Sequence, residues 1–432
     1  MVISSIDLKG GHVVQLKNGK DLVLQRDDAD KLIAGFNTYG EVAVIDLDAA
    51  LRNTDEKGNT PNTELLKSLL RKGNVRVGGG IRDIKKAKEL ISLGAEKVII
   101  GSAAWKKAPA AGESPLDTEF LGKLAEAIGK QRIIISVDAI HGKIAVRGWT
   151  ETIDVPLIDG AREAEKFASE LLFTCVEKEG CMEGTDMDMV RALREAVHCR
   201  VVAAGGVNSL EQVAALEKAG CDVQLGMALY TGAVRLEDCF SACLDWEKTG
   251  GMIPIIAQSP AGEVLMHGYA NKEALAKTME TKQLTFWSRT RKALWTKGET
   301  SGHFLAVQKL RADCDRDTIL ATVEPHGSVC HTGSFTCFGS APDERSSMER
   351  LYATIADRFA NPRPGSYTAT LNDKRVREKV MEEAEELTEA EDKKDVIWEA
   401  ADVLYFISVL MYKEGVTWQD IYDELDRRHK EH

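Results

Sequence analysis

The sequence lacks a long apolar run, an excess of positive charge and an N-terminal leader pattern. Its best apolar run, Val403 to Tyr412, has ten residues, whereas crossing a bilayer takes roughly 18. The chain carries 56 Lys and Arg against 68 Asp and Glu, a net charge of −12, and nucleic-acid binding needs clustered positive charge instead. The first residues show no basic lead or cleavage site, so we expect no signal peptide. These absences argue against membrane and nucleic-acid partners and favour a cytoplasmic protein.

The cysteines do not fit a secreted protein. Nine of them, an odd number, are spread over 432 residues, which argues against a disulfide framework and for a reducing compartment. At about 150 residues per domain this length suggests three domains, and a hydrophobic content of 44% is enough for packed cores. Two small polar stretches resemble linkers, Glu247–Gly251 and Gly339–Ser347. We therefore expect domains at residues 1–246, 252–338 and 347–432.

Short β-branched runs alternate with amphipathic helical patterns in the first segment. Residues 84–93 and 210–219 have the periodicity of helices. Four runs have the composition of buried parallel strands, namely residues 42–46, 98–100, 133–137 and 201–203. Alternation of this kind over about 240 residues predicts a closed (β/α)8 barrel.

An internal repeat supports the barrel. Glycine pairs recur at residues 79–80 and 205–206, and each pair is followed by a Gly-x-Ala turn, which begins at Gly101 or at Gly226. The two halves match in direct order at a nearly constant offset. Two half-barrels of four strands each would produce such a repeat.

The repeated residues have chemistry that suits the mouth of a barrel. Each glycine turn follows a strand and precedes a helix, where backbone N–H groups and the helix dipole can hold a phosphate. The candidate phosphate-binding residues are Gly79, Gly80, Gly101, Ser102, Gly205, Gly206 and Gly226. Asp7 and Asp138 follow apolar strands, so they reach the catalytic face and can act as a general acid and a general base. The alternative is that the glycines are packing turns and the aspartates cap helices.

The first 240 residues resemble the phosphoribosylformimino-AICAR-phosphate (ProFAR) isomerases of histidine biosynthesis. The resemblance rests on residues 6–14, 44–48, 77–82, 137–139, 146–151, 205–207 and 228–230. The Arg-Gly-Trp stretch at residues 147–149 favours the isomerase over the related cyclase barrel. The resemblance implies an Amadori rearrangement of an aminoaldose to an aminoketose. It makes Asp7 the base and Asp138 the acid, with Trp149 stacked on the substrate.

One motif departs from this family. Where the family usually reads Thr-x-x-x-x-Asp-Gly-Thr, the chain has Glu179 in the aspartate position and Cys181 in that of the last threonine. A glutamate carboxylate lies one methylene further from the backbone, and a misplacement of about 1 Å can cost on the order of 100-fold in rate. The alternative to an active isomerase is therefore a non-catalytic barrel that binds ligand or organises the oligomer.

The middle segment concentrates metal-binding residue types. These residues are Asp313, Asp315 and Asp317, together with Cys314, Cys330 and Cys337. In an extended strand the three aspartates would share one face and Cys314 would point to the other. Three carboxylates suit Mg²⁺, and three thiolates suit Zn²⁺ with a fourth position open for water. A structural zinc or three unrelated buried thiols are the alternatives.

This segment closely resembles phosphoribosyl-AMP cyclohydrolase from residues 268–271 to 337–338. Residues 286–290 and 294–302 supply aromatic faces, cations and hydroxyls that can hold an adenine and a sugar phosphate. The resemblance implies opening of the purine ring between N1 and C6 by a zinc-activated water. It also implies a dimer that completes the thiolate site across its interface. By this resemblance the three cysteines bind zinc and the three aspartates bind magnesium, with His331 as a proton carrier. The further substrate candidates are Arg289, Trp295 and Lys297.

The last segment carries two acidic clusters on helical patterns. An EExxE motif at residues 382–386 is followed by ExxD at residues 399–402. These spacings place like charges on one helix face, where they repel unless a cation lies between them. Apolar stretches beside both clusters would pack the two helices together and bring the clusters face to face. A solvated acidic face is the alternative.

This pattern resembles the all-α nucleotide pyrophosphohydrolases. Residues 366–368 and 379–387 look specifically like phosphoribosyl-ATP pyrophosphohydrolase. The resemblance implies that Mg²⁺ held by the acids activates water and holds the triphosphate, so that pyrophosphate is released. The implied ligands and phosphate contact are Glu382, Glu383, Glu386, Glu399, Asp402 and Lys379.

The three resemblances name consecutive steps of one pathway. They predict an (β/α)8 barrel, a small β-rich α+β metal domain and an all-α C-terminal domain, with Zn²⁺ and Mg²⁺ as cofactors. The expected partners are phosphoribosyl nucleotides and a second copy of the chain, because the two C-terminal families suggest a homodimer or larger assembly. The expected function is a trifunctional histidine-biosynthesis enzyme. The alternatives are a bifunctional enzyme with a non-catalytic barrel, and a zinc-stabilised interaction protein.

Overall fold

The computed structural model describes residues 1–106, 113–339, 347–362 and 365–431. Most of the predicted linker at Gly339–Ser347 lies outside these residues. Within them, no helix has the length and apolar character needed to span a membrane. The chain forms two compact units, Met1–Ala257 with His267–His326 and Lys430–His432, and Gln258–Met266 with Gly327–His429.

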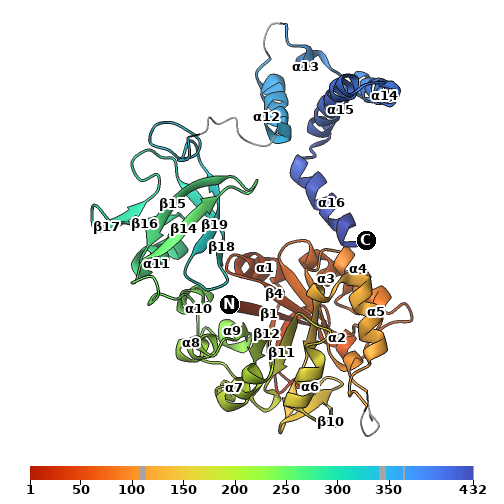
Figure 1. The fold of residues 1–432 in the computed structure, drawn as a ribbon, viewed down its shortest axis with the longest axis vertical. Coiled ribbons are helices and arrows are strands. Elements are labelled where there is room, and N and C mark those ends of the chain that lie inside the picture. Colours follow the sequence, from red (N-terminus) through yellow and green to blue (C-terminus); the bar gives the residue numbers. More distant parts are fainter. Residues whose placement is uncertain (107–112, 340–346, 363–364, 432) are drawn as a thin grey trace. The chain divides into compact units, whose positions relative to one another are not determined.

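Eight parallel strands close into a barrel in the first unit (Figure 1). In barrel order they are β1 (Val2–Lys9), β4 (Val42–Asp46), β5 (Val75–Gly78), β6 (Lys97–Ile100), β7 (Ile133–Ser136), β11 (Glu170–Thr174), β12 (Arg200–Ala204) and β13 (Asp222–Leu225). β1 pairs in parallel with β4 and also with β13, where Val2 lies opposite Val223, and the second pairing closes the sheet. The predicted strands correspond to β4, β6, β7 and β12, and the predicted barrel is confirmed.

Helices cover the outside of this barrel (Figure 1). They are α1 (Ala29–Asn37), α3 (Thr63–Leu70), α4 (Ile84–Ser92), α5 (Thr118–Ile128), α6 (Leu157–Ala164), α7 (Met187–Ala196), α8 (Leu210–Lys218) and α10 (Leu236–Ala242). Two short helices, α2 (Leu47–Ala50) and α9 (Met227–Tyr230), lie instead at the carboxyl ends of β4 and β13. Short 3₁₀ turns are η1 (Ser102–Ala104), η2 (Lys130–Arg132) and η3 (Val176–Lys178). The strands outside the barrel wall are β2 (His12–Lys17), β3 (Asp21–Arg26), β8 (Ala139–Ile140), β9 (Lys143–Val146) and β10 (Glu151–Pro156).

The internal repeat extends to the backbone conformation. Asp83 caps α4 with φ −147° and ψ 162°, and Ser209 caps α8 with φ −146° and ψ 161°. Each side chain accepts a hydrogen bond from the backbone N–H three residues on, which satisfies a free donor of the first helical turn. Side chains from the strands fill the centre of the barrel. Its buried core cluster is Ile3, Ala43, Ile99, Ile134, Leu172, Val202 and Ala204.

A smaller sheet follows the barrel. Its elements are β14 (Ile253–Gln258), β15 (Val264–Ala270), α11 (Lys272–Thr281), β16 (Thr285–Ser288), β17 (Ala293–Thr296), β18 (Leu305–Ala312) and β19 (Ile319–Pro325). Four strands pair in the order β15-β14-β19-β18, and β16 and β17 form a separate hairpin. β18 is thus an edge strand of the four-stranded sheet.

The C-terminal part is helical. Its elements are α12 (Ser347–Ala360), α13 (Tyr367–Thr370), α14 (Asp373–Glu389), α15 (Lys393–Glu414) and α16 (Trp418–Glu431). Asn372 and Asp392 cap the starts of α14 and α15, and Gly415 ends α15 with φ +70°. The helices pack through a buried cluster of Ile355, Leu371, Val376, Phe406 and Val409. The predicted three-part fold class is confirmed.

Candidate functional site

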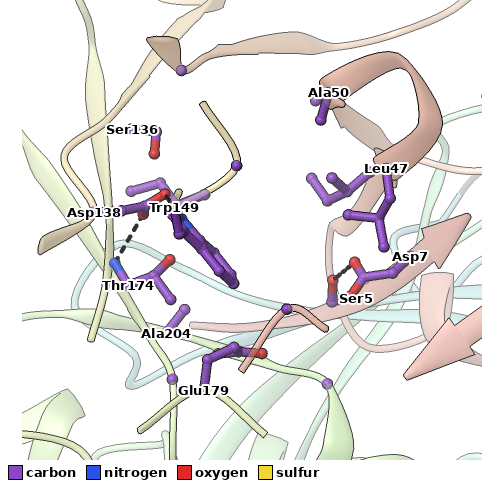
Figure 2. Close-up of a pocket in the computed structure, with 18 of the residues that line it drawn as sticks. Ser5, Asp7, Leu47, Ala50, Ser136, Asp138, Trp149, Thr174, Glu179 and Ala204 are labelled. Carbon is purple, nitrogen blue, oxygen red and sulfur yellow. Dashed lines mark hydrogen bonds between the residues drawn. The ribbon is translucent and has the colours of Figure 1, made fainter. Parts of the chain in front are cut away.

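A pocket of about 230 Å³ opens where the carboxyl ends of the barrel strands meet (Figure 2). Every residue that the sequence assigned to the barrel site lines it. They are Asp7, Gly79, Gly80, Gly101, Ser102, Asp138, Trp149, Gly205, Gly206 and Gly226. The two halves of the repeat therefore contribute to one cavity, at the end of the barrel where catalytic groups of this fold gather.

The glycine turns need glycine for steric reasons. Gly79 and Gly205 have φ +100° and +91°. A Cβ atom would lie 2.1 Å from the Asp46 carbonyl oxygen at the first position, and 2.7 Å from that of Cys175 at the second. Only glycine combines such a backbone conformation with such a close approach. The Ser102 hydroxyl accepts a hydrogen bond of 2.6 Å from the Arg147 backbone N–H.

Asp7 lies on β1, on one side of the pocket. Its Oδ1 accepts a hydrogen bond of 3.0 Å from the Ser5 hydroxyl (Figure 2). Burial raises the pKa of Asp7 to about 6, and the hydrogen bond offsets only part of that effect. Near neutral pH this carboxyl can therefore accept a proton as a base and hold it afterwards.

Asp138 lies on the opposite side, in the loop after β7 (Figure 2). Its Oδ2 accepts 2.7 Å from the indole Nε1 of Trp149, and its Oδ1 accepts 3.1 Å from the Thr174 backbone N–H. Burial raises the pKa of Asp138, and these donors counteract the rise because they stabilise the carboxylate. The hydrogen bond from Nε1 to Asp138 also fixes the Trp149 ring beside the cavity. The backbone of Trp149 has φ +66°.

Glu179 reaches the pocket from a third side, after η3 (Figure 2). Burial, and then the charges of Asp7 and Asp138, raise the pKa of Glu179 to about 8. At neutral pH this carboxyl is thus protonated, beside Asp7, whose pKa of about 6 is lower. Sequence reasoning treated Glu179 only as a departure, although a carboxyl in a motif's aspartate position was a signal for a third acid.

A cation at the pocket was also missed. Arg82 lines the cavity next to the first glycine pair. Its guanidinium donates to the carbonyl oxygens of Ala49 and Ala50 at 3.0 and 2.8 Å. The residue belongs to the 77–82 motif, so its place beside a phosphate-binding turn could have been inferred.

The aspartates of the middle segment lie in a turn, so the extended strand expected there is wrong. Residues 313–318 connect β18 to β19, and Arg316 has φ +63°. Asp313 Oδ1 accepts from the backbone N–H groups of Asp317 and Thr318 at 3.0 and 3.2 Å. Aspartate side chains favour turns over strands through such bonds. The turn still gathers Asp313, Asp315 and Asp317, whose nearest oxygens all lie within 4.8 Å of one another.

The three candidate zinc cysteines are divided between the two units. Cys314 lies in the aspartate turn and is exposed. Cys330 and Cys337 follow β19 in the other unit, and neither is buried. The Thr332 hydroxyl donates 3.1 Å to Cys330 Sγ, and it is the largest cause that lowers the pKa of this thiol. His331 Nδ1 lies 3.9 Å from the same sulfur.

The other candidates of the middle segment have different surroundings. The Arg289 guanidinium lies 4.0 Å from the centre of the Tyr269 ring, and the Trp295 ring lies 5.7 Å from that of Phe286. Lys297 is buried, and its ammonium donates 3.3 Å to the backbone oxygen of His303.

The acidic clusters of α14 and α15 come together as the spacing predicted. Oxygens of Glu383, Glu386 and Glu399 all lie within 4.8 Å of one another. Burial and the neighbouring acids raise the pKa of Glu399, and one of its oxygens is buried with no hydrogen-bond partner among the described residues. Such an orphaned carboxylate oxygen fits a cation ligand.

The other two predicted ligands, Glu382 and Asp402, lie at the edge of that group. The Lys379 ammonium contacts Glu382 at 2.7 Å and Glu383 at 2.6 Å. Glu382 thus faces a lysine, whereas Asp402 lies near enough to Glu399 to raise its pKa.

Three family models match the chain in succession. Residues 1–235 match the model described as histidine biosynthesis protein. Residues 266–339 match phosphoribosyl-AMP cyclohydrolase, and residues 348–429 match phosphoribosyl-ATP pyrophosphohydrolase. The matches agree with the three resemblances found in the sequence.

Curated relatives include histidine biosynthesis bifunctional proteins HisIE. That of Vibrio cholerae is 43% identical over 197 residues, which cover 43% of this chain and 94% of that protein. That of Pasteurella multocida is 44% identical over 200 residues, with 43% and 98% covered. That of Escherichia coli is 42% identical over 194 residues, with 43% and 96% covered. The chain therefore belongs to the histidine biosynthesis proteins, as a fusion of a barrel of that family with the two domains of the bifunctional HisIE proteins.

Proposed function

We propose that the chain catalyses three consecutive steps of histidine biosynthesis. Its helical part hydrolyses phosphoribosyl-ATP to phosphoribosyl-AMP and pyrophosphate, its middle part opens the adenine ring to give ProFAR, and its barrel isomerises ProFAR. The observation that carries this proposal is the succession of three family matches within one chain. The product of each of the first two reactions is the substrate of the next.

The barrel pocket supports the isomerisation. Asp7 would remove the C2 proton, since its raised pKa suits a base that acts near neutral pH. Trp149 would stack on the substrate. The two sets of glycine turns, with Arg82 beside the first, would hold phosphates at the two ends of the substrate.

Two carboxyls could protonate the ring oxygen of the substrate. Asp138 is the acid implied by the resemblance; burial raises its pKa, and the donors from Trp149 and Thr174 oppose that rise. Glu179 has a pKa of about 8 and retains its proton at neutral pH. We propose that Glu179 supplies the proton, with Asp138 orienting Trp149. This assignment makes the glutamate a working replacement for the family's aspartate.

The middle part would use the metal ligands implied by its family. The donor set fits, since three thiolates suit zinc and three carboxylates suit magnesium. Zinc, when bound, supplies a water of lowered pKa for attack at neutral pH. Cys314, Cys330 and Cys337 would hold zinc, Asp313, Asp315 and Asp317 would hold magnesium, and His331 would carry a proton. Arg289, Trp295 and Lys297 would line the nucleotide.

The helical part would bind magnesium through Glu383, Glu386 and Glu399, with Asp402 and Glu382 nearby. The orphaned oxygen of Glu399 supports this ligand set. Magnesium, when bound, neutralises phosphate charge and orients a water. Lys379 would then exchange its carboxylate partners for a phosphate of the substrate.

Organisation and location complete the proposal. We propose domains at residues 1–246, 252–338 and 347–432, a homodimer or larger assembly, and a cytoplasmic protein. The apolar side chains of Val396, Ile397 and Trp398 support a partner for α15, because they are 44%, 61% and 67% exposed.

The test uses the purified full-length chain. Phosphoribosyl-ATP is supplied with Mg²⁺ and Zn²⁺, and pyrophosphate release, ring opening and the aminoketose are followed separately. Three successive products are expected, and Asp138→Asn should impair only the last. A wild-type reaction that stops at ProFAR would contradict the isomerase and leave a bifunctional enzyme with a non-catalytic barrel.

A further inference from the structure

The aspartate turn of the middle segment is attached to the barrel through Arg316. This residue lies between two of the three candidate magnesium ligands, yet its guanidinium turns away from them to pair with Glu217 of α8 and Asp222 of β13. Its backbone oxygen accepts 2.8 Å from the Asp245 N–H. Arg316 is 19% exposed. Side chain and main chain thus fix one residue of the turn to the part of the chain that forms the barrel.

The strand that leads into the turn is also held by barrel residues. The Leu310 N–H of β18 donates 2.7 Å to the carbonyl oxygen of Thr38. The Lys309 ammonium donates 3.2 Å to Asn37 Oδ1. An edge strand otherwise leaves such backbone groups unpaired. The anchoring therefore extends from β18 into the turn.

A lysine pairs with two of the three carboxylates of the turn. Lys248 lies in the stretch 247–251 that the sequence marked as a linker, and its ammonium pairs with both Asp315 and Asp317, at 2.6 Å from the latter. The Lys248 backbone N–H donates 3.0 Å to Asp245 Oδ1, which fixes the base of this side chain. Two carboxylates so close repel unless a cation lies between them. In this structure the Lys248 ammonium takes the place of that cation.

We propose that the barrel positions the metal-binding turn of the middle domain, with Arg316 as its anchor and Lys248 as an internal counter-ion that a divalent cation displaces. This inference rests on the proposed function only in taking the turn to bind a divalent cation. It gives the barrel a second role, which does not depend on its own catalysis. It also makes the Lys248 ammonium a competitor of the metal, because both require the same two carboxylates.

The first test measures cation binding at the turn in the full-length chain. Hydrogen exchange is followed by mass spectrometry in a peptide covering residues 313–318 while Mg²⁺ is titrated, so the second acidic cluster does not contribute to the signal. In Lys248→Gln we expect about tenfold faster exchange without metal and a severalfold lower half-saturating Mg²⁺ concentration. Lys85→Gln, at an exposed position of α4, is the matched control and should behave as wild type.

The second test removes the anchor. Glu217→Gln should also accelerate exchange in the turn, whereas Glu56→Gln, an exposed barrel glutamate, should not. Unchanged exchange in both Lys248→Gln and Glu217→Gln, or an unchanged Mg²⁺ requirement in Lys248→Gln, would overturn the proposal. If wild-type chain opened no adenine ring but Mg²⁺ still protected the turn, the cyclohydrolase would fail and this inference would stand.

Discussion

The barrel pocket and the α14–α15 pair both collect acidic side chains, but they place different groups around them. In the pocket, Asp7 and Glu179 have raised pKa values of about 6 and 8. On α14, Glu382 has a lowered pKa because Lys379 pairs with it. The pocket raises the pKa of its carboxyls, whereas the helix pair holds both kinds: Lys379 keeps Glu382 charged, and burial beside other acids raises the pKa of Glu399.

The difference follows from what surrounds each group. The pocket withdraws its carboxyls from water and offers hydroxyl, indole and amide donors, with no cation bonded to Asp7 or Asp138 among the described residues. In the helix pair, lysine and arginine lie beside Glu382, whereas Glu383 and one oxygen of Glu399 are buried. Desolvation favours the neutral form, whereas a neighbouring cation favours the charged form. The same residue types thus suit proton transfer in one region and cation binding in the other.

Removing the base of the barrel should have the largest effect. Asp7→Asn leaves the pocket without a group that can accept the C2 proton, so isomerisation of ProFAR should fall by about 10³-fold or more. The aminoketose is measured with ProFAR as substrate. Pyrophosphate release should stay unchanged, and Asp159→Asn on α6 is the exposed control. A residual rate within tenfold of wild type would rule out Asp7 as the base.

Removing a ligand from the helix pair tests the other side of the comparison. Glu399→Gln deletes the orphaned oxygen's charge, so pyrophosphate release from phosphoribosyl-ATP should fall by about 100-fold. Added Mg²⁺ should restore part of the rate, since the loss is one of cation affinity. Glu385→Gln, on the same helix as Glu383 and Glu386, should keep the wild-type rate. Equal losses in both variants would point to general destabilisation.

The pH profile of the barrel tests which carboxyl is the acid. We expect kcat/KM for ProFAR to rise as Asp7 ionises near pH 6 and to fall as Glu179 ionises near pH 8. Because the groups interact, these limbs report apparent values of the coupled set. Glu179→Gln should lose the alkaline limb and about 10- to 100-fold in rate. An alkaline limb that survives in this variant would assign the proton to Asp138.

Glu179 should also leave a small signature in stability. The folded chain keeps its proton up to about pH 8, whereas the unfolded chain loses it near 4.5. Between these values the native state binds more protons, so stability falls as pH rises. Glu179→Gln has no such proton and does not lose stability in this way. Its melting temperature should therefore exceed that of wild type by a margin that grows from pH 5 to pH 8. A constant difference would contradict the raised pKa.

Much of the barrel could be predicted because its determinants are local. The strands at residues 42–46 and 133–137 are apolar runs of the right length, and the two glycine pairs occupy positions with φ between +69° and +100° that other residues avoid. The face-to-face acids of α14 and α15 followed from two local signals: residues three or four apart share a helix face, and the apolar stretches beside both clusters pack the helices together.

The aspartate turn could not be predicted in the same way. The segment that begins at Asp313 can form either an extended strand or a turn in which Asp313 bonds the backbone of Asp317. Which of these conformations forms depends on contacts of β18, β19 and Arg316 with distant residues. Lys248 is 67 positions away from Asp315 in the chain. Its pairing with that aspartate has no local signal.

The sequence by itself determined the periodicity of strands and helices, the glycines of the phosphate turns, and the residue types at each site. Only the tertiary structure decided what the carboxyls do. Asp7, Asp138 and Glu179 come from three separate strands or loops, and their pKa values depend on the water that the fold excludes and on the charges that it brings together. Those quantities belong to distances in space, which residue order alone does not contain.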